Sequence, residues 1–170
     1  MSMPSASAKP THQLRPATKA DVEFLWTLRQ RVMKENVEQT WGKWDDAQQR
    51  QFFDRGFVPK DTSIIVVDGK DVGRIDLNHS HMEIFLGIIE LMPDLQGKGI
   101  GSAVLRGLMQ EASAQRLPIR LQVLKANTGA HKLYLHLGFK DVGDTKTHFL
   151  MVYAPPGSSV PPWHIPKTKA

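Results

Sequence analysis

The sequence predicts an α/β domain with a mixed, mostly antiparallel central sheet and flanking helices. Three observations support this class: helical patterns that give way to a run of strands, a glycine-rich turn that leads from a strand into an amphipathic helix, and a later alternation of strand, helix and strand. Hydrophobic residues form 41% and charged residues 23% of the 170 residues, which is ordinary globular usage. A chain of this length suits a single domain.

The first part of the chain reads as one strand followed by two helices. Residues 14–18 favour a short strand. Thr18, followed three residues later by Asp21, is an acidic variant of the capping box and marks the start of a helix. Either Asp45 or Asp46 is suited to cap a second helix, because a short acidic side chain accepts a hydrogen bond from a first-turn amide.

Strand patterns follow and then alternate with helices. Residues 63–67, 72–78 and 83–91 are rich in β-branched and apolar residues and are separated by polar turns, which predicts an antiparallel meander. From Ile100 the apolar residues fall on one helical face. A later helix ends at Gly138, a residue typical of a left-handed C-cap. The remaining predicted elements are a strand at 119–124, that helix at about 128–137, and strands at 139–142 and 148–153.

The predicted domain lies between two tails. Residues 1–12 are mostly small and polar and residues 155–170 are rich in proline, so both are expected to be flexible. The single domain is therefore expected at residues 13–154. The sequence shows no internal repeat and no second domain boundary.

Composition argues against several classes of function. The chain has no cysteine, which excludes a disulfide framework, a thiolate metal site and a cysteine nucleophile. The longest apolar stretches are far too short to span a bilayer, and residues 1–10 do not resemble a targeting segment. We therefore expect a cytoplasmic protein that makes no use of a membrane.

The basic charge and the histidines carry little functional signal. The formal net charge is +5, but the basic residues are scattered, which favours a solvated surface that would attract an anionic cofactor over a nucleic-acid groove. His79 and His81 lie near a turn without carboxylate partners at ligand spacing. We expect neither nucleic-acid binding nor a metal.

The strongest local signal is the segment 91–102, where a strand ends, glycines follow and a helix begins. Glycines let a ligand approach the backbone closely, and the unpaired amides of a helix start favour phosphate oxygens. The segment predicts a diphosphate cradle. A P-loop is excluded because Gly97 and Lys98 are followed by Gly99, and a dinucleotide fingerprint fits poorly at Ser102.

Two segments resemble elements of the GCN5-related N-acetyltransferase (GNAT) family. Residues 96–101, Gln-Gly-Lys-Gly-Ile-Gly, are similar to the family element Gln/Arg-x-x-Gly-x-Gly/Ala. Residues 127–139 resemble Asn-x-x-Ala-x-x-Leu-Tyr-x-x-x-Gly-Phe. The likeness runs from about residue 14 to 153, although only the second half matches through specific motifs.

The resemblance implies an N-acetyltransferase that moves an acetyl group from acetyl-CoA directly to a primary amine. Asn127 would hydrogen-bond the coenzyme A arm, although a helix cap is its alternative role. Tyr134 would donate a proton to the departing thiolate, or else be a half-buried core residue. The residues implied in binding acetyl-CoA are Leu91, Met92, Gln96, Gly97, Lys98, Gly99, Ile100, Gly101, Ser102 and Asn127.

Three residues are candidates for the base that takes the proton from the amine. Glu83 and Glu90 lie on one predicted strand with opposite parity, so we expect them on opposite faces of the sheet. Each has an ordinary solvated or paired carboxylate as its alternative. His148, at the start of a later strand, is suited to shuttle a proton near neutral pH, or else is a surface residue.

The acceptor amine is not specified by the sequence. Trp41 and Trp44 stand where the first helices of this family line the acceptor pocket, although core packing is the alternative for large aromatics. A small molecule or amino-acid derivative is the leading acceptor. A protein or peptide amine, and a non-catalytic acyl-CoA sensor, remain open, as does a homodimer.

Overall fold

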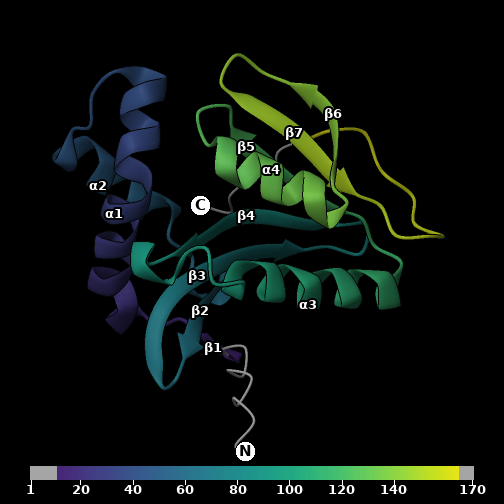
Figure 1. Cartoon of the computed structure of the whole chain (residues 1–170), viewed down its shortest axis with the longest axis horizontal. Helices are drawn as coiled ribbons and strands as arrows, with labels where there is room; N and C mark the ends of the chain where they lie inside the picture. The colour runs from purple at the N-terminus through teal and green to yellow at the C-terminus, as the bar shows by residue number, and fades with distance from the viewer. Residues whose placement is uncertain (1–10, 165–170) are drawn as a thin grey trace, which may run out of the picture.

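A seven-stranded sheet forms the centre of the molecule, with strand order β1-β2-β3-β4-β5-β7-β6 in this computed structural model, which describes residues 11–164 (Figure 1). Only the β4–β5 pair is parallel. The mixed, mostly antiparallel sheet that the sequence predicts is thus confirmed. The strands are β1 (His12–Pro16), β2 (Thr62–Val67), β3 (Lys70–His79), β4 (Ile84–Leu91), β5 (Ile119–Leu124), β6 (Lys140–Asp144) and β7 (His148–Tyr153).

Local capping sets the helix ends. The α-helices are α1 (Val22–Trp41), α2 (Asp46–Gly56), α3 (Ile100–Gln115) and α4 (Thr128–Leu137), with short 3-10 turns η1 (Lys19–Asp21), η2 (Pro59–Asp61) and η3 (Pro93–Leu95). The capping box of Thr18 and Asp21 is confirmed and starts η1, which leads into α1. Asp45 caps α2 by accepting from the Gln48 amide at 2.8 Å. Gly138 ends α4 with a left-handed φ of 107°.

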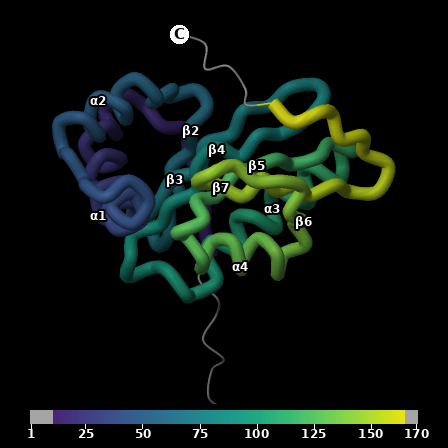
Figure 2. Tube along the Cα trace, turned by 90° about the horizontal axis from the view of Figure 1, so that it is seen from above, coloured from purple at the N-terminus to yellow at the C-terminus, as the bar shows by residue number. Residues whose placement is uncertain are grey.

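The helices form one layer on each face of the sheet (Figure 2). On one face α3 and α4 cover the main core, where Leu105 of α3 and Phe139 pack with Ile75 of β3. On the other face α1 and α2 cover a smaller core built on Leu25, Leu28 and Phe53. Because successive side chains of a strand point to opposite faces, the central strands contribute side chains to both cores and are buried on two sides.

Trp44 belongs to the junction between α1 and α2. It is only 8% exposed, and its ring stacks on Trp26 with centroids 6.1 Å apart. Trp26 in turn lies 5.6 Å from the Phe53 ring. The indole nitrogen of Trp44 donates to Asp46 at 2.6 Å, which satisfies its buried donor. Trp44 therefore has the packing role that the sequence left open.

A β-bulge at Gly87 makes β4 part from β5. Asp76 of β3 pairs with Ile88 and Leu77 pairs with Leu86, which leaves Gly87 without a partner on β3. The parallel pairing of β4 with β5 covers only Ile84–Leu86, and the rest of β5 pairs with β7 alone. The two central strands are therefore joined at one end and open at the other.

The bulge also reverses which face the later residues of β4 point to. Ile84 and Leu86 before it, and Ile89 and Leu91 after it, all belong to the core under α3. An extra residue in one strand shifts the alternation by one. Glu90 consequently faces α1, on the same side of the sheet as Glu83. The expectation that the two carboxylates face opposite sides was wrong, because it assumed unbroken alternation.

Residues 155–164 of the predicted flexible C-terminal tail contact the sheet. The buried Arg120 of β5 donates hydrogen bonds to the carbonyl oxygens of Pro161 and Pro162, and its guanidinium lies 5.3 Å from the Trp163 ring centre. Nε2 of His164 lies 2.9 Å from a carboxylate oxygen of Glu83. Most of the proposed N-terminal tail, residues 1–10, and the last part of this one, residues 165–170, fall outside the described residues.

Within residues 11–164, no helix combines the length and the apolar character that a bilayer crossing requires.

The close approach of β3 to β4 gives a stability prediction. A Cβ atom at Gly73 would lie 2.3 Å from the carbonyl oxygen of Glu90 and 2.8 Å from a methyl carbon of Leu91. We expect Gly73→Ala to lower the free energy of unfolding by about 1–3 kcal/mol, because the strands must move apart. Urea denaturation measures the change.

Gly107→Ala provides the matched control for this substitution. Gly107 is an exposed residue inside α3, and a Cβ atom there meets no heavy atom within 4 Å. Alanine is expected to raise stability by roughly 0.5–1 kcal/mol at such a position. A Gly73→Ala protein as stable as the wild type would contradict the close approach.

Candidate functional site

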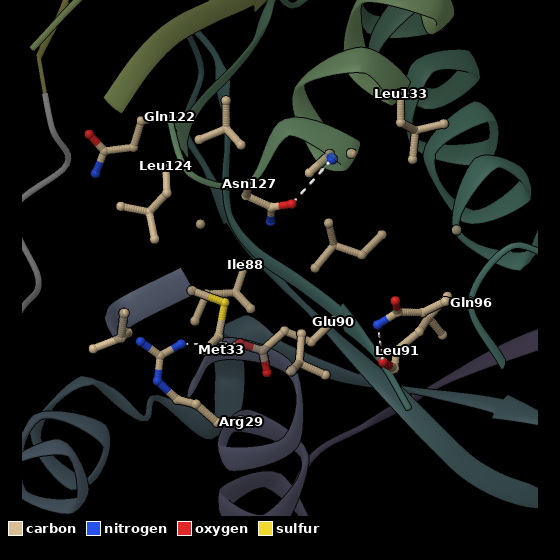
Figure 3. Close-up of a pocket in the computed structure, with 18 of the residues that line it drawn as sticks. Arg29, Met33, Ile88, Glu90, Leu91, Gln96, Gln122, Leu124, Asn127 and Leu133 are labelled. Atoms are coloured by element: carbon tan, nitrogen blue, oxygen red, sulfur yellow. Dashed lines mark hydrogen bonds and ion pairs between the residues drawn. The ribbon is translucent and has the colours of Figure 1, made fainter. Parts of the chain in front are cut away.

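A large cleft of about 1260 Å³ opens where β4 and β5 part (Figure 3). One wall is formed by the turn before α3 and by the start of α4, and the facing wall comes from α1 and from the start of α2. Gln122 and Leu124 of β5 and His148 of β7 also line it. The splay of the two strands thus connects a glycine-rich helix start on one side with a helical pocket on the other.

The turn before α3 presents a row of backbone amides to the cleft. Gly97 and Gly99 have left-handed φ values of 74° and 84°, a conformation that side chains disfavour. The Gly99 carbonyl accepts the first helical hydrogen bond, from Ala103 at 3.0 Å. The amides of residues 100–102 therefore precede the helical ladder and have no acceptor within it, and of these residues Gly101 and Ser102 line the cleft. The lining residues of this segment are Gln96, Gly97, Gly99, Gly101 and Ser102.

Three predicted cofactor residues do not line the cleft. Ile100 is buried in the core and holds the start of α3 in place. Lys98 is exposed. Met92 packs beside α1, where its sulfur lies 3.7 Å from Arg31 Nη1. By contrast Gln96 ties the turn to the sheet, since its side-chain amide donates to the Leu91 carbonyl at 3.0 Å.

The end of β4 offers one further amide to the cleft. The Met92 amide donates to the Val72 carbonyl of β3 at 2.8 Å. Because successive amides of a strand point to opposite edges, the Leu91 amide points away from β3, toward the gap left by β5. Leu91 lines the cleft as predicted.

Two residues of the second predicted motif reach the cleft from α4. Asn127 caps that helix, because its side-chain oxygen accepts from the Ala130 amide at 3.2 Å. Its amide nitrogen is left on the cleft side, as Figure 3 shows. Tyr134 is buried against Phe139, with ring centroids 5.6 Å apart, and burial raises its pKa to about 12. The phenol therefore stays protonated near neutral pH and can act as an acid.

Glu90 is a buried carboxylate at the centre of the cleft. It is 3% exposed, and one of its oxygens accepts from Arg29 Nη1 at 3.1 Å. The other oxygen has no hydrogen-bond partner among residues 11–164. Burial raises the Glu90 pKa above its ordinary value, while Arg29 and Arg74 act in the opposite direction. This carboxylate can therefore take up a proton more readily than a solvated one.

His148 lines the cleft from the start of β7 and is half-buried. Burial lowers its pKa, which keeps the imidazole neutral near pH 7. One ring nitrogen lies 2.7 Å from the Thr147 hydroxyl. The structure thus brings His148 and Glu90, two of the three candidate bases, into one cleft.

Glu83 stands apart from this group. It directly precedes β4 and does not line the cleft. It lies about 20 Å along the strand from Glu90. Its carboxylate is 2.7 Å from Nε of Arg120, the residue that donates to the Pro161 and Pro162 carbonyl oxygens of the C-terminal segment. The proposal of Glu83 as a base therefore finds no support in its position.

The two candidate tryptophans also separate. Trp41 lines the cleft and is 58% exposed, whereas Trp44 lies in the α1–α2 junction. Sequence reasoning did not identify Arg29, Met33 or Gln122, which also line the cleft. Each is an isolated residue on a helix or strand with no motif around it, so only the assembled fold marks it.

A family model of acetyltransferases, the Acetyltransferase (GNAT) family, matches residues 25–139. The chain belongs to the GNAT family. No curated protein matches this GNAT chain in sequence. The match covers both of the motifs that the sequence analysis related to the family.

Solved structures share the GNAT fold of this chain. An acetyltransferase from Thermus thermophilus is 18% identical with a TM-score of 0.68, over 85% of this chain and 97% of that one. PaiA N-acetyltransferase from Thermoplasma acidophilum, in complex with coenzyme A, is 18% identical with a TM-score of 0.65, over 85% and 99%. Ribosomal-protein-S18-alanine N-acetyltransferase from Escherichia coli is 20% identical with a TM-score of 0.62, over 89% and 97%.

Within residues 11–164 of this GNAT protein, no cluster of three or more histidine, aspartate or glutamate side chains is arranged to hold a metal ion. His79 instead pairs with Glu111 at 3.1 Å.

The amide cradle gives a binding prediction. We expect Gly99→Val to weaken coenzyme A binding at least about tenfold, because a β-branched residue resists the left-handed φ of 84° and displaces the amides of the first turn. Isothermal titration calorimetry with coenzyme A measures the loss.

Gly69→Val controls for backbone strain alone. Gly69 has a φ of 74° and lies in the β2–β3 turn, away from the cleft. This variant is expected to lose stability and keep the wild-type affinity. Equal affinities of wild type and Gly99→Val would contradict the cradle.

Proposed function

We propose that this GNAT protein transfers an acetyl group from acetyl-CoA directly to a primary amine of a small molecule or amino-acid derivative. The observation that carries the proposal is the continuity of the cleft. It joins the amide row at Gly97–Ser102 to a buried acid, Tyr134, and a buried carboxylate, Glu90, and then to a pocket walled by α1 and α2. This continuity supports a donor, proton-transfer groups and an acceptor arranged along one path.

Coenzyme A fits the cradle for a physical reason. The amides at the start of α3 and the positive end of its dipole favour the two phosphate groups of the diphosphate. No side chain at Gly97 or Gly99 obstructs the approach. The Leu91 amide and the Asn127 side chain, both in the cleft, can hydrogen-bond the pantetheine arm. These contacts would fix the thioester at the splay of β4 and β5, which supplies orientation.

The proton-transfer groups suit a direct transfer. The amine nitrogen forms a bond to the thioester carbonyl carbon, and the carbon–sulfur bond breaks. The amine proton passes to Glu90 or His148, directly or through water, and the hydroxyl of Tyr134 protonates the leaving thiolate. Tyr134 then recovers a proton from solvent. The pKa of Tyr134, raised to about 12, means that its hydroxyl carries a proton when the thiolate leaves, and the raised pKa of Glu90 makes that carboxylate a stronger base.

The cleft favours a small acceptor over a protein. The α1 wall of the pocket side is apolar, with Val32, Met33 and Val37 lining it and the exposed Trp41 at its end. A structural neighbour is described as acting on a ribosomal protein, but at 20% identity that likeness concerns the fold alone. A protein or peptide acceptor, or a sensor that binds acyl-CoA without turnover, is an outcome of the test below.

The proposed acid is tested by a matched pair of tyrosines. The chain has two tyrosines. The second, Tyr153, does not line the cleft, and its hydroxyl forms a 3.1 Å hydrogen bond with the Ser113 hydroxyl. Thiol release from acetyl-CoA with a panel of amines measures turnover. Tyr134→Phe is expected to reduce kcat about a hundredfold with little change in coenzyme A affinity, and Tyr153→Phe to keep wild-type kcat.

Two outcomes oppose this assignment. A Tyr134→Phe variant with wild-type kcat would show that Tyr134 is not the acid. Saturable acetyl-CoA binding without thiol release for any small amine or peptide would replace the enzyme by a sensor.

The proposed base is tested by pH. A base must be deprotonated to accept a proton, so kcat/KM is expected to fall as the pH drops through the pKa of Glu90. This fall, the acidic limb of the pH profile, is expected at a pH above the ordinary glutamate pKa of about 4.3, because burial raises the pKa of Glu90. Glu90→Gln is expected to lower kcat/KM about a hundredfold and to abolish that acidic limb. His148→Gln serves as the comparison. Loss of the limb in His148→Gln with Glu90→Gln unaffected would make the histidine the base.

A further inference from the structure

A second, smaller cavity of about 110 Å³ adjoins the cleft beneath α1 and α2. It shares the wall residues Arg29, Phe52 and Ile88 with the main cleft, and Arg29 is the residue that donates to Glu90. Its volume exceeds what a single water molecule needs. The remaining wall residues are Phe53, Gly56, Phe57 and Arg74.

Arg74 brings an unsatisfied charge to this cavity. The residue is 2% exposed, and its Nε and Nη2 atoms donate to the two carboxylate oxygens of Asp76. Its Nη1 atom is buried and has no hydrogen-bond partner among residues 11–164. A buried donor without an acceptor is costly, so such a group calls for a ligand or solvent partner.

The phenylalanine walls do not supply that partner. The Arg74 guanidinium carbon lies 5.8 Å from the centre of the Phe53 ring. A contact of this kind attracts the cation without accepting a well-formed hydrogen bond. The cavity is therefore apolar on its aromatic side and rich in donors on its arginine side.

Arg29 adds further donors at the junction with the cleft. A guanidinium carries five N–H donors, and one hydrogen bond of Arg29 to Glu90 is present. Glu90 and Asp76 balance the two arginine charges, but their oxygens do not reach all the donors. An additional anionic acceptor with two oxygens would match the planar fork of a guanidinium.

We propose that this cavity is a carboxylate subsite, so that the acceptor is a primary amine that also bears a carboxylate, an amino acid with an apolar side chain. The inference deepens the proposed function and rests on it. Arg74 and Arg29 bind the carboxylate, the phenylalanine rings exclude water from it, and the amine lies toward Glu90. The apolar side chain extends along Met33 toward Trp41, which line the same cleft.

Binding of a carboxylate that lacks the amine tests the subsite without turnover. Calorimetry with 3-phenylpropanoate, on protein saturated with coenzyme A, is expected to show one saturable site in the wild type. Arg74→Gln is expected to weaken that binding at least about tenfold, the loss typical of a charge-assisted hydrogen bond. Absence of saturable binding to the wild type would mean that the cavity holds water only and would overturn the proposal.

Arg55→Gln is the matched control, and Arg74→Lys is the second variant. Arg55 lies on the outer side of Phe52, with its guanidinium carbon 5.6 Å from the ring centre, and it does not line the cavity. The control is expected to bind as the wild type does. Arg74→Lys keeps the positive charge and loses the planar guanidinium that binds two oxygens, so it is also expected to weaken binding. It replaces Arg74→Gln as the test if that variant does not fold. Unchanged affinity in a folded Arg74 variant would contradict the subsite.

Turnover separates this inference from the proposed function. Each amino acid is paired with its decarboxylated amine: phenylalanine with 2-phenylethylamine, leucine with 3-methylbutylamine. The proposal expects kcat/KM to favour the amino acid at least about tenfold. Equal or faster transfer to the amines in both pairs would overturn the subsite and leave the acetyltransferase in place. Carboxylate binding without acetyl transfer to any amine would overturn the proposed acetyltransferase activity and leave the carboxylate subsite in place.

Discussion

The departure of β4 from β5 after Leu86 is the constraint on which the rest of the structure depends. One unpaired residue, Gly87, ends the parallel pairing after three residue pairs, and the sheet opens there instead of closing into a continuous surface. The same bulge turns Glu90 toward α1 and away from the α3 core. The open edge leaves the Leu91 amide without a strand partner on the β5 side, so a backbone donor becomes available in the cleft.

Around this opening the molecule keeps several groups in states that cost stability. The glycines before α3 adopt left-handed φ values, and the buried Arg29, Glu90, Arg74 and Asp76 form a charged group with donors and acceptors left over. Such a network stabilises a fold only when every member is satisfied, and here it is not. A ligand that enters the cleft could supply the hydrogen bonds that these buried groups lack. We therefore relate the groups to ligand binding and not to packing.

Local patterns predicted the elements, and longer-range pairing decided the site. The capping box at Thr18, the glycine-rich start of α3 and the left-handed end of α4 are visible within a few residues, and each is present. The parity of Glu83 and Glu90 could not be predicted, because the bulge is defined by register with β3. For the same reason Arg29 and Arg74, which are far apart in sequence, gave no sign that they meet at one cavity.

The central claim is that backbone amides at the start of α3 bind a diphosphate. Nuclear magnetic resonance of nitrogen-15-labelled protein, titrated with coenzyme A, observes those amides one by one. If these amides bind the diphosphate, the Gly99, Gly101 and Ser102 amide protons will show saturable downfield shifts that share one dissociation constant. Saturation confined to other residues, with these amides unmoved, would contradict it.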